Sequence, residues 1–269
     1  WFVMMGRGLV DPVDDFRPTN PASHPELLDY LAVNFMEGGW SLKSLIRELV
    51  LTRSYRMSAD FNRTAFEKDP ENSLQWRHSP KKIDAEALRD AMLFASGNLD
   101  ITRPLGSEIA VGGDIRVGGP RSPRGATNRD RSTNYRSVYL PAARDNLPEA
   151  LALFDPADPN LVTGKREETN VPDQALYLMN NPFVLQQAEA MAKRLLSEAD
   201  TPREQFSEAF LLCYGRPANK EEVEASLAFL QRFQITAGAD SQNRNKIRYL
   251  AFTSFCQSLL ISAEFRYLN

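Results

Sequence analysis

The polar residues best suited to chemistry lie between residues 136 and 181, where acids, arginines and amides alternate with turn-forming prolines. The candidate ligand-binding residues are Arg144, Asp155, Asp158, Asn160, Arg166, Thr169, Gln174 and Asn180. Two carboxylates can act as general acid and general base when their surroundings separate their pKa values. One hypothesis is therefore an enzyme with Asp155 and Asp158 in these roles. Its anionic or polysaccharide substrate would be bound by Arg144 and Arg166.

Two other interpretations of these residues stay open. Buried polar side chains of both signs must be paired, so this region also fits an internal hydrogen-bond network that fixes the irregular middle of the chain to helices. Asp155, Asp158 and Asn160 are a weak candidate for a calcium site, because calcium prefers oxygen ligands. The motif has too few ligands for an EF-hand loop, and its prolines favour a plain turn. The sequence favours the structural network and leaves catalytic residues unassigned.

The sequence gives little support to a catalytic or metal site built on histidine or cysteine. The chain has two histidines, His24 and His78, and two cysteines, Cys213 and Cys256. Neither cysteine belongs to a C-x-x-C or C-x-x-C-H motif, so a zinc ribbon, a redox dithiol and a haem attachment are disfavoured in this chain. We expect no cofactor here. Both cysteines fall in apolar helical patterns and should be buried, and a disulfide between them stays possible.

Charge is unevenly distributed along the chain. The net charge is −3, which disfavours nucleic-acid binding because phosphate neutralisation needs a basic face. Eight arginines and no lysine nevertheless lie between residues 100 and 145. The guanidinium fork suits carboxylate, sulfate or phosphate groups, so this segment is a candidate contact surface for anions such as an anionic glycan, or else a solvated loop. No apolar run is long enough to cross a membrane, so no membrane span is expected.

Helical periodicity and end signals predict most of the fold. Helices are expected over residues 23–37, 41–50, 82–96, 171–178, 182–198, 201–215, 219–233 and 246–262. Capping boxes are predicted where Ser23 precedes Glu26 and Thr201 precedes Glu204, and Asn219 with Glu222 should cap another helix. Residues 136–140 alternate as a short β-strand does.

The predicted fold class is mainly α: a helical bundle-like domain with a long irregular, Arg- and Gly-rich central insertion and a minor short β element. Residues 99–134 hold six of the fourteen glycines and three prolines, without sustained periodicity. We expect residues 1–269 to form one family domain, with N-terminal helices over 1–98, the irregular segment over 99–170 and C-terminal helices over 171–269. The first residues look like the middle of an element, which predicts a fragment of a longer protein.

Short motifs along almost the whole chain resemble one known family. They are Gly6 to Val10, His24 to Asp29, Gly39 to Lys43, Tyr55-Arg56, Ala85 to Ala91, Arg136 to Leu140, Phe154-Asp155, Asp158 to Asn160, Arg166 to Asn170, Pro172 to Leu176, Asn180 to Val184, Tyr214 to Pro217 and Ser262 to Phe265. In this order they resemble the planctomycete-type C-terminal domain of unknown function 1553. Asn170 departs from the pattern, since relatives often have a second threonine there, which puts any role of that threonine in doubt.

The resemblance implies a context and no mechanism. Proteins of this family usually carry a second uncharacterised domain upstream, and often a cytochrome-c-like haem domain behind a secretion signal. It therefore implies an extracytoplasmic protein, periplasmic or secreted, whose partners are upstream domains of the same polypeptide and whose haem, where present, lies on such a domain. Together with the scarcity of catalytic motifs, this favours a non-catalytic binding or scaffold module over the enzyme hypothesis.

Overall fold

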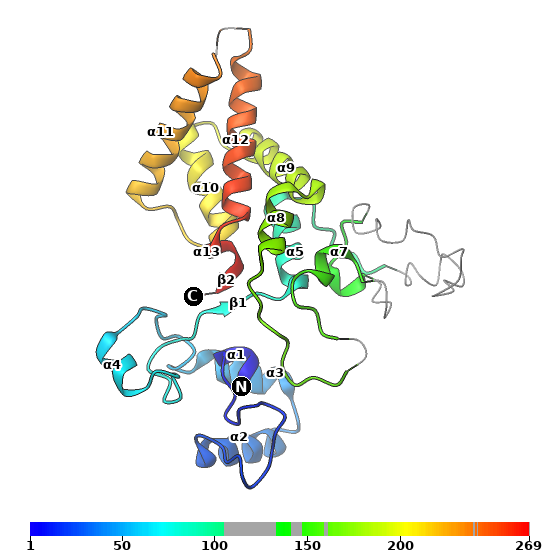
Figure 1. Cartoon of the computed structure of the whole chain (residues 1–269), viewed down its shortest axis with the longest axis vertical. Coiled ribbons are helices and arrows are strands. Elements are labelled where there is room, and N and C mark those ends of the chain that lie inside the picture. Colours follow the sequence, from blue (N-terminus) through cyan, green and yellow to red (C-terminus); the bar gives the residue numbers. More distant parts are fainter. Residues whose placement is uncertain (105–132, 141–146, 159–160, 239, 241, 269) are drawn as a thin grey trace, which may run out of the picture. The chain divides into compact units, whose positions relative to one another are not determined.

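The computed structural model describes residues 1–104, 133–140, 147–158, 161–238, 240 and 242–268, and it is mainly helical as predicted (Figure 1). The chain divides into two compact units. Unit 1 comprises residues 1–82, 161–167 and 267–269, and unit 2 comprises residues 83–160 and 168–266. Most of the predicted Arg- and Gly-rich insertion, residues 105–132, lies outside the described residues.

Unit 1 contains four helices and a small antiparallel sheet. The helices are α1 (Phe2–Met5), α2 (Pro25–Glu37), α3 (Leu42–Leu51) and α4 (Arg63–Lys68). The sheet pairs β1 (Lys81–Lys82) with β2 (Tyr267–Leu268), with Lys81 opposite Leu268 and Lys82 opposite Tyr267. The sheet therefore joins the end of the N-terminal region to the end of the chain.

The start of α2 differs from its prediction. The N-cap is His24, which makes no side-chain cap hydrogen bond, so the expected Ser23–Glu26 capping box does not form. The Ser23 hydroxyl instead donates to the carbonyl of Leu9 at 3.2 Å. The helix thus begins one residue later than predicted, with His24 at the N-cap and Ser23 bound to a residue distant in the sequence.

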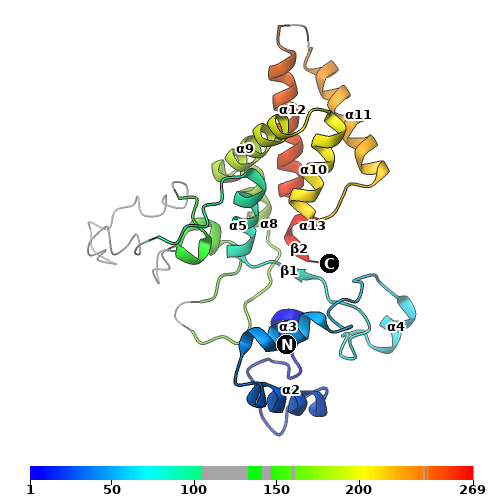
Figure 2. The same cartoon turned by 180° about the vertical axis from the view of Figure 1, so that it is seen from behind.

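Unit 2 is a helical bundle. Its elements are α5 (Ala85–Ser96), the short 3₁₀ turn η2 (Ser137–Tyr139), α7 (Glu149–Ala152), α8 (Pro172–Asn180), α9 (Pro182–Glu198), α10 (Pro202–Tyr214), α11 (Lys220–Thr236), α12 (Arg244–Leu260) and α13 (Ala263–Arg266). Helix α12 packs against α9 and α11, and α9 also packs against α5. Figures 1 and 2 show α11 and α12 running antiparallel.

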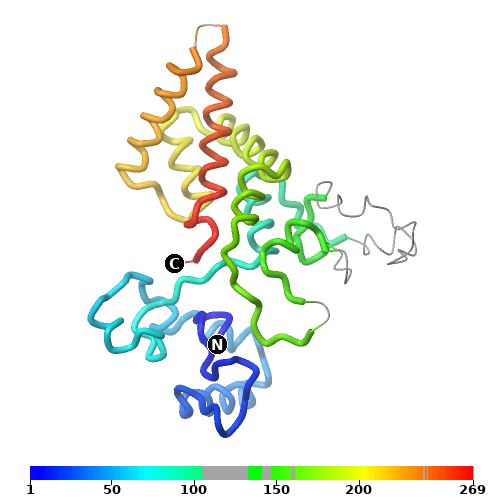
Figure 3. The backbone as a smooth tube through the Cα atoms, viewed as in Figure 1, coloured from blue at the N-terminus to red at the C-terminus, as the bar shows by residue number. Residues whose placement is uncertain are grey.

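The core of unit 2 is fully sealed from solvent. Leu93, Met191, Leu195, Phe252 and Leu260 are among its most buried side chains. The three longest helices, α9, α11 and α12, have 17 residues each and give the bundle its length (Figure 3). Removing such apolar side chains from water is the main driving force for assembling these helices.

The helix ends of unit 2 confirm several predictions. Thr201 with Glu204 and Asn219 with Glu222 form complete capping boxes at the starts of α10 and α11. Helix α10 ends at Gly215, whose φ of 68° is the left-handed conformation that glycine adopts without steric cost. These local signals therefore fix where both helices begin and where α10 ends.

The strand predicted over residues 136–140 is wrong. This segment forms the single turn η2, because the backbone N–H and the hydroxyl of Ser137 both donate to Oδ1 of Asp90, each at 2.7 Å. The two hydrogen bonds fold the chain onto α5, so the segment pairs with no strand among the described residues. The minor β element lies instead in the β1–β2 pair.

Candidate functional site

Three of the predicted site residues meet just after α7. The carboxylate of Asp155 accepts hydrogen bonds from the Thr169 hydroxyl at 2.5 Å and from the Thr169 backbone N–H at 3.0 Å. The amide of Gln174, which is fully buried, donates to the carbonyl of Leu153 at 3.1 Å and lies 3.3 Å from the Thr169 hydroxyl. We call Asp155, Thr169 and Gln174 the Asp155 network.

The geometry of this network suits a structural role. Both carboxylate oxygens of Asp155 accept hydrogen bonds from Thr169, and Asp155 has a φ of 55°, a left-handed conformation that Asp tolerates better than most residues. The network joins residue 155 to residue 169, and both to the first turn of α8, which carries Gln174. The Asp155 carboxylate therefore holds the backbone at Thr169.

The other candidates are placed as follows. Asp158 is exposed, and Arg166 is half-buried in the part of the chain that belongs to unit 1. Asn180 donates to the carbonyl of Leu176, one turn earlier in its own helix, at 2.9 Å. Arg144 and Asn160 lie outside the described residues.

The calcium candidate can be described only in part, since Asn160 is one of its three residues. Within the described ranges, no group of three or more His, Cys, Asp or Glu side chains has an arrangement that could hold a metal ion. Asp155, the central member of the candidate, already accepts two hydrogen bonds from Thr169.

A buried arginine on α5 anchors the chain where the Arg-rich segment ends. Arg89 is 2% exposed and lies over the ring of Phe183, 5.3 Å from its centroid. Its guanidinium donates to the carbonyls of Thr133 at 2.7 Å and Tyr135 at 3.0 Å, and to the hydroxyl of Ser137 at 3.3 Å. These hydrogen bonds offset part of the cost of burying a charge.

The two ends of that segment lie side by side. The backbone N–H of Asp100 donates to the carbonyl of Asn134 at 2.8 Å, and Asp100 forms a parallel bridge with Tyr135. On the far side of this bridge, Asp90 binds Ser137. Residues 100 and 134, which lie at the two ends of the Arg- and Gly-rich insertion, are therefore hydrogen-bonded to each other.

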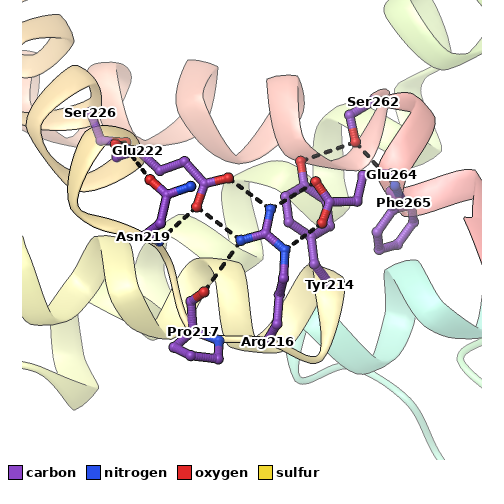
Figure 4. Close-up of polar contacts among 9 residues, drawn as sticks. All are labelled: Tyr214, Arg216, Pro217, Asn219, Glu222, Ser226, Ser262, Glu264 and Phe265. Carbon is purple, nitrogen blue, oxygen red and sulfur yellow. Dashed lines mark hydrogen bonds and ion pairs between the residues drawn. The ribbon is translucent and has the colours of Figure 1, made fainter. Parts of the chain in front are cut away.

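Sequence reasoning missed a second polar centre, shown in Figure 4. Arg216, in the turn after α10, binds Glu222 of α11 and Glu264 of α13, each through two hydrogen bonds of 2.6 to 2.9 Å. Next to it the Tyr214 hydroxyl donates to the Ser262 hydroxyl at 3.0 Å. We call Arg216, Glu222 and Glu264 the Arg216 junction.

The junction lowers the pKa of Glu222. Hydrogen bonds from Arg216, supported by the backbone N–H of Asn219, hold the pKa of the Glu222 carboxyl below its usual value although partial burial acts in the opposite direction. Because both carboxylates are paired with one guanidinium, the junction is suited to joining helices. One signal in the sequence was available, since Arg216 and Glu264 each belong to a motif that carries the family resemblance.

Unit 1 exposes several apolar side chains around the turn between α2 and α3. The exposed side chains are Val33, Met36, Trp40, Leu42 and Ile46. Trp40 is 66% exposed, has a φ of 60° and lies edge-on against Phe35, with 5.3 Å between ring centroids. A bulky residue in this left-handed conformation is a true outlier, and the surrounding fold must hold it there.

An apolar cavity lies beside this turn. Its volume is about 350 Å³, and residues of α2 and α3 line it, including Leu31, Phe35 and Leu45, together with Trp1 and Phe16. No residue of α2 is fully buried. The apolar face predicted for α2 therefore lines an open cavity and does not enter a closed core.

Both cysteines are free thiols. Burial raises the pKa of Cys213 to about 12 and that of Cys256 well above its ordinary value. A thiol of this kind is a poor nucleophile, because the thiolate is the reactive form. As predicted, both behave as small apolar residues of the core of unit 2.

Comparison with known proteins supplies a family and no activity. No described helix has the length and apolar character that a membrane crossing requires. No curated protein and no solved structure matches the chain significantly. The model of one protein family, PSD1, described as a protein of unknown function (DUF1553), matches residues 1–230, which confirms the resemblance found in the sequence. The chain therefore belongs to the PSD1 (DUF1553) family, whose domain forms part of larger proteins.

Proposed function

We propose that this chain is a non-catalytic binding or scaffold module of an extracytoplasmic multidomain protein. The exposed apolar surface of the α2–α3 turn carries this proposal. Large contiguous apolar patches are uncommon on isolated soluble domains and mark contact surfaces. Trp40, held outward with strained backbone, is the residue type most enriched among the energetic centres of protein interfaces.

The polar networks support the same role. In the Asp155 network the carboxylate binds a backbone N–H and a hydroxyl, and buried Gln174 binds a backbone carbonyl. The guanidinium of Arg89 likewise donates hydrogen bonds to backbone carbonyls. Side chains used in this way hold irregular segments in place, which is what a module that displays a fixed surface needs.

The partner of this surface would be another domain of the same polypeptide. The family belongs to larger proteins, and the sequence resemblance connects it with secreted proteins that often carry a cytochrome-c-like domain. A haem, if the parent protein carries one, would lie on such a domain, since Cys213 and Cys256 are free, buried and outside any haem-attachment motif.

Hydrogen–deuterium exchange tests the contact surface directly. Exchange is compared between residues 1–269 alone and the full-length parent protein. Peptides covering residues 30–51 should exchange more slowly in the parent, because contact with another domain excludes water from α2 and α3. Peptides from α12 serve as the control and should exchange equally in both. Equal exchange of residues 30–51 in the two proteins would show that no domain covers this surface.

A pair of substitutions tests the structural role of Asp155. Thr169→Val removes the hydroxyl that binds Asp155 and leaves the carboxylate in place. The structural role predicts that Thr169→Val and Asp155→Ala each lower the free energy of unfolding by about 1 to 3 kcal/mol. A stability unchanged in both variants would contradict it and return Asp155 to the list of candidate acids.

A further inference from the structure

The segment between α4 and β1 is irregular but firmly held. The buried carboxylate of Asp69 accepts hydrogen bonds from the N–H and hydroxyl of Ser73 and from the N–H of Leu74, at 2.7 to 2.9 Å. The Asn72 amide donates to the carbonyl of Arg77 and to the hydroxyl of Ser79, both at 2.9 Å. We call residues 58–80 the aromatic loop.

This loop displays aromatic rings on its surface. Phe61 is 61% exposed and Phe66 is 40% exposed, and their ring centroids lie 5.4 Å apart. Trp76 lies edge-on to Phe61, with centroids 6.3 Å apart, and its indole N–H donates to the carbonyl of Asp69 at 2.9 Å. Phe61, just before α4, and Phe66, on α4, thus keep aromatic surface in water, where it contributes little to the core.

An arginine is stacked within the same group of rings. The guanidinium of Arg77 lies 4.8 Å from the centroid of Trp76 and 5.7 Å from that of Phe61. Such cation–π contacts fix the plane of the guanidinium and leave its N–H edge available for binding.

Arg77 is paired with no carboxylate among the residues that the structure describes. Its side chain makes one long hydrogen bond, from Nη1 to the carbonyl of Ala59 at 3.4 Å, and its Nε is buried without an acceptor. The neighbouring Arg63 differs, since it binds Glu67 within α4 at 3.1 Å. Nη2 has no hydrogen-bond partner among the described residues, and a carboxylate can accept two parallel hydrogen bonds from the Nη1–Nη2 end of a guanidinium.

We propose that Phe61, Phe66 and Arg77 form a binding site for a carboxylate-bearing glycan of the uronic-acid type. The exposed rings take the apolar C–H face of a pyranose, and the guanidinium binds the carboxylate at its edge. This gives the anionic glycan considered in the sequence analysis a site on residues outside the Arg-rich segment between residues 100 and 145.

A glycan fits this surface better than an acidic peptide does. Two neighbouring exposed rings offer flat apolar faces to a ligand that is itself flat and apolar on one side. An acidic peptide gains nothing from the rings through its charged side chains. The inference goes beyond the proposed scaffold function, because that function requires no carbohydrate. The glycan site and the scaffold function are tested independently. If no glycan binds, the exchange experiment on residues 30–51 is unaffected.

Isothermal titration calorimetry with trigalacturonate tests the site on the full chain. Wild-type protein should bind trigalacturonate and should bind its methyl ester, which has the same sugar without the charge, at least tenfold more weakly. Arg77→Gln should weaken trigalacturonate binding at least tenfold, in keeping with the loss of a charged hydrogen bond. Arg63→Gln, the matched control on α4, should change binding less than twofold.

Phe61→Ala keeps the test decisive if Arg77→Gln does not fold, because Phe61 is largely exposed and its loss should leave the loop intact. It should weaken binding of trigalacturonate severalfold. The proposal is overturned if wild-type protein does not bind trigalacturonate, if the methyl ester binds equally well, or if Phe61→Ala binds like wild type. Tighter binding of a hexaglutamate peptide than of trigalacturonate would overturn it in favour of a peptide site.

Discussion

Arg216 and Glu264 lie 48 residues apart and meet through two hydrogen bonds, Nε to Oε1 at 2.6 Å and Nη2 to Oε2 at 2.9 Å. The same guanidinium binds Glu222 through Nη1 and Nη2. One side chain therefore joins the turn after α10 to the first turn of α11 and to α13. In this junction a single guanidinium pairs with two carboxylates from two different helices.

Replacing Arg216 should destabilise the fold measurably. Arg216→Met keeps the aliphatic stem and leaves two carboxylates side by side without a cation. Because the junction is about one-third exposed, we expect a loss of about 1 to 3 kcal/mol in the free energy of unfolding, measured by urea titration. Arg63→Met, which breaks the fully exposed pair with Glu67, should cost about 0.5 kcal/mol or less. Equal losses in the two variants would contradict the special role of Arg216.

Acid should weaken the junction in a defined range. Hydrogen bonds from Arg216 lower the pKa of Glu222 in the folded state, so its contribution is complete above the ordinary glutamate pKa and is lost as the pH falls through the lowered value. Below about pH 5, urea titrations should show a steeper loss of stability for wild type than for Arg216→Met. Parallel pH profiles would show that the ion pair contributes nothing to folding.

The core extends past the region matched by the family model. That match ends at residue 230, inside α11, yet α12 supplies Phe252, Phe255 and Leu260 to the core. A chain ending at residue 230 should therefore lack cooperative thermal unfolding and bind the dye ANS, as expected for an unsealed core. A chain ending at residue 262, which keeps α12 and loses Glu264 and Phe265, should fold with a lower Tm. Cooperative unfolding of residues 1–230 would show that α12 is dispensable.

Neither cysteine should react with a thiol reagent in the folded protein. Burial raises the pKa of Cys213 to about 12, so almost none of it is thiolate at pH 8. Cys256 is fully buried and its pKa is raised for the same reason. The thiol reagent DTNB should release no colour from the native protein at pH 8 and should label both cysteines in guanidinium chloride. Fast labelling of either thiol in the native protein would contradict this burial.

The sequence predicted what depends on neighbouring residues. The capping boxes at Thr201 and Asn219 and the helix end at Gly215 are confirmed, because each is decided within one turn of helix. The box at Ser23 did not form because His24 takes the N-cap position, while the backbone N–H and the hydroxyl of Ser23 both donate to the carbonyl of Leu9, 14 residues earlier. The strand at 136–140 failed because Asp90, 47 residues away, binds Ser137. Contacts between residues this far apart in the sequence cannot be predicted from the spacing of neighbouring residues.

The site was predictable to a similar extent. Asp155, Thr169 and Gln174 were among the residues that the sequence identified together, and hydrogen bonds do join them. The Arg216 junction was missed because its partners are acids and an arginine of ordinary type, spread over three elements. Arg77 was missed for another reason: its significance lies in the rings around it and in the absence of a described carboxylate partner, neither of which spacing reveals.

The pairing of β1 with β2 has a consequence for synthesis of the protein. Lys81 and Lys82 emerge from the ribosome early, whereas their partners Leu268 and Tyr267 emerge roughly 185 residues later. At ordinary translation rates this delay is about 10 to 40 seconds. During it the edge of β1 has no partner, and α9 lacks the α12 surface against which it packs. Chaperones that shield nascent chains should therefore bind this region most before α12 is made.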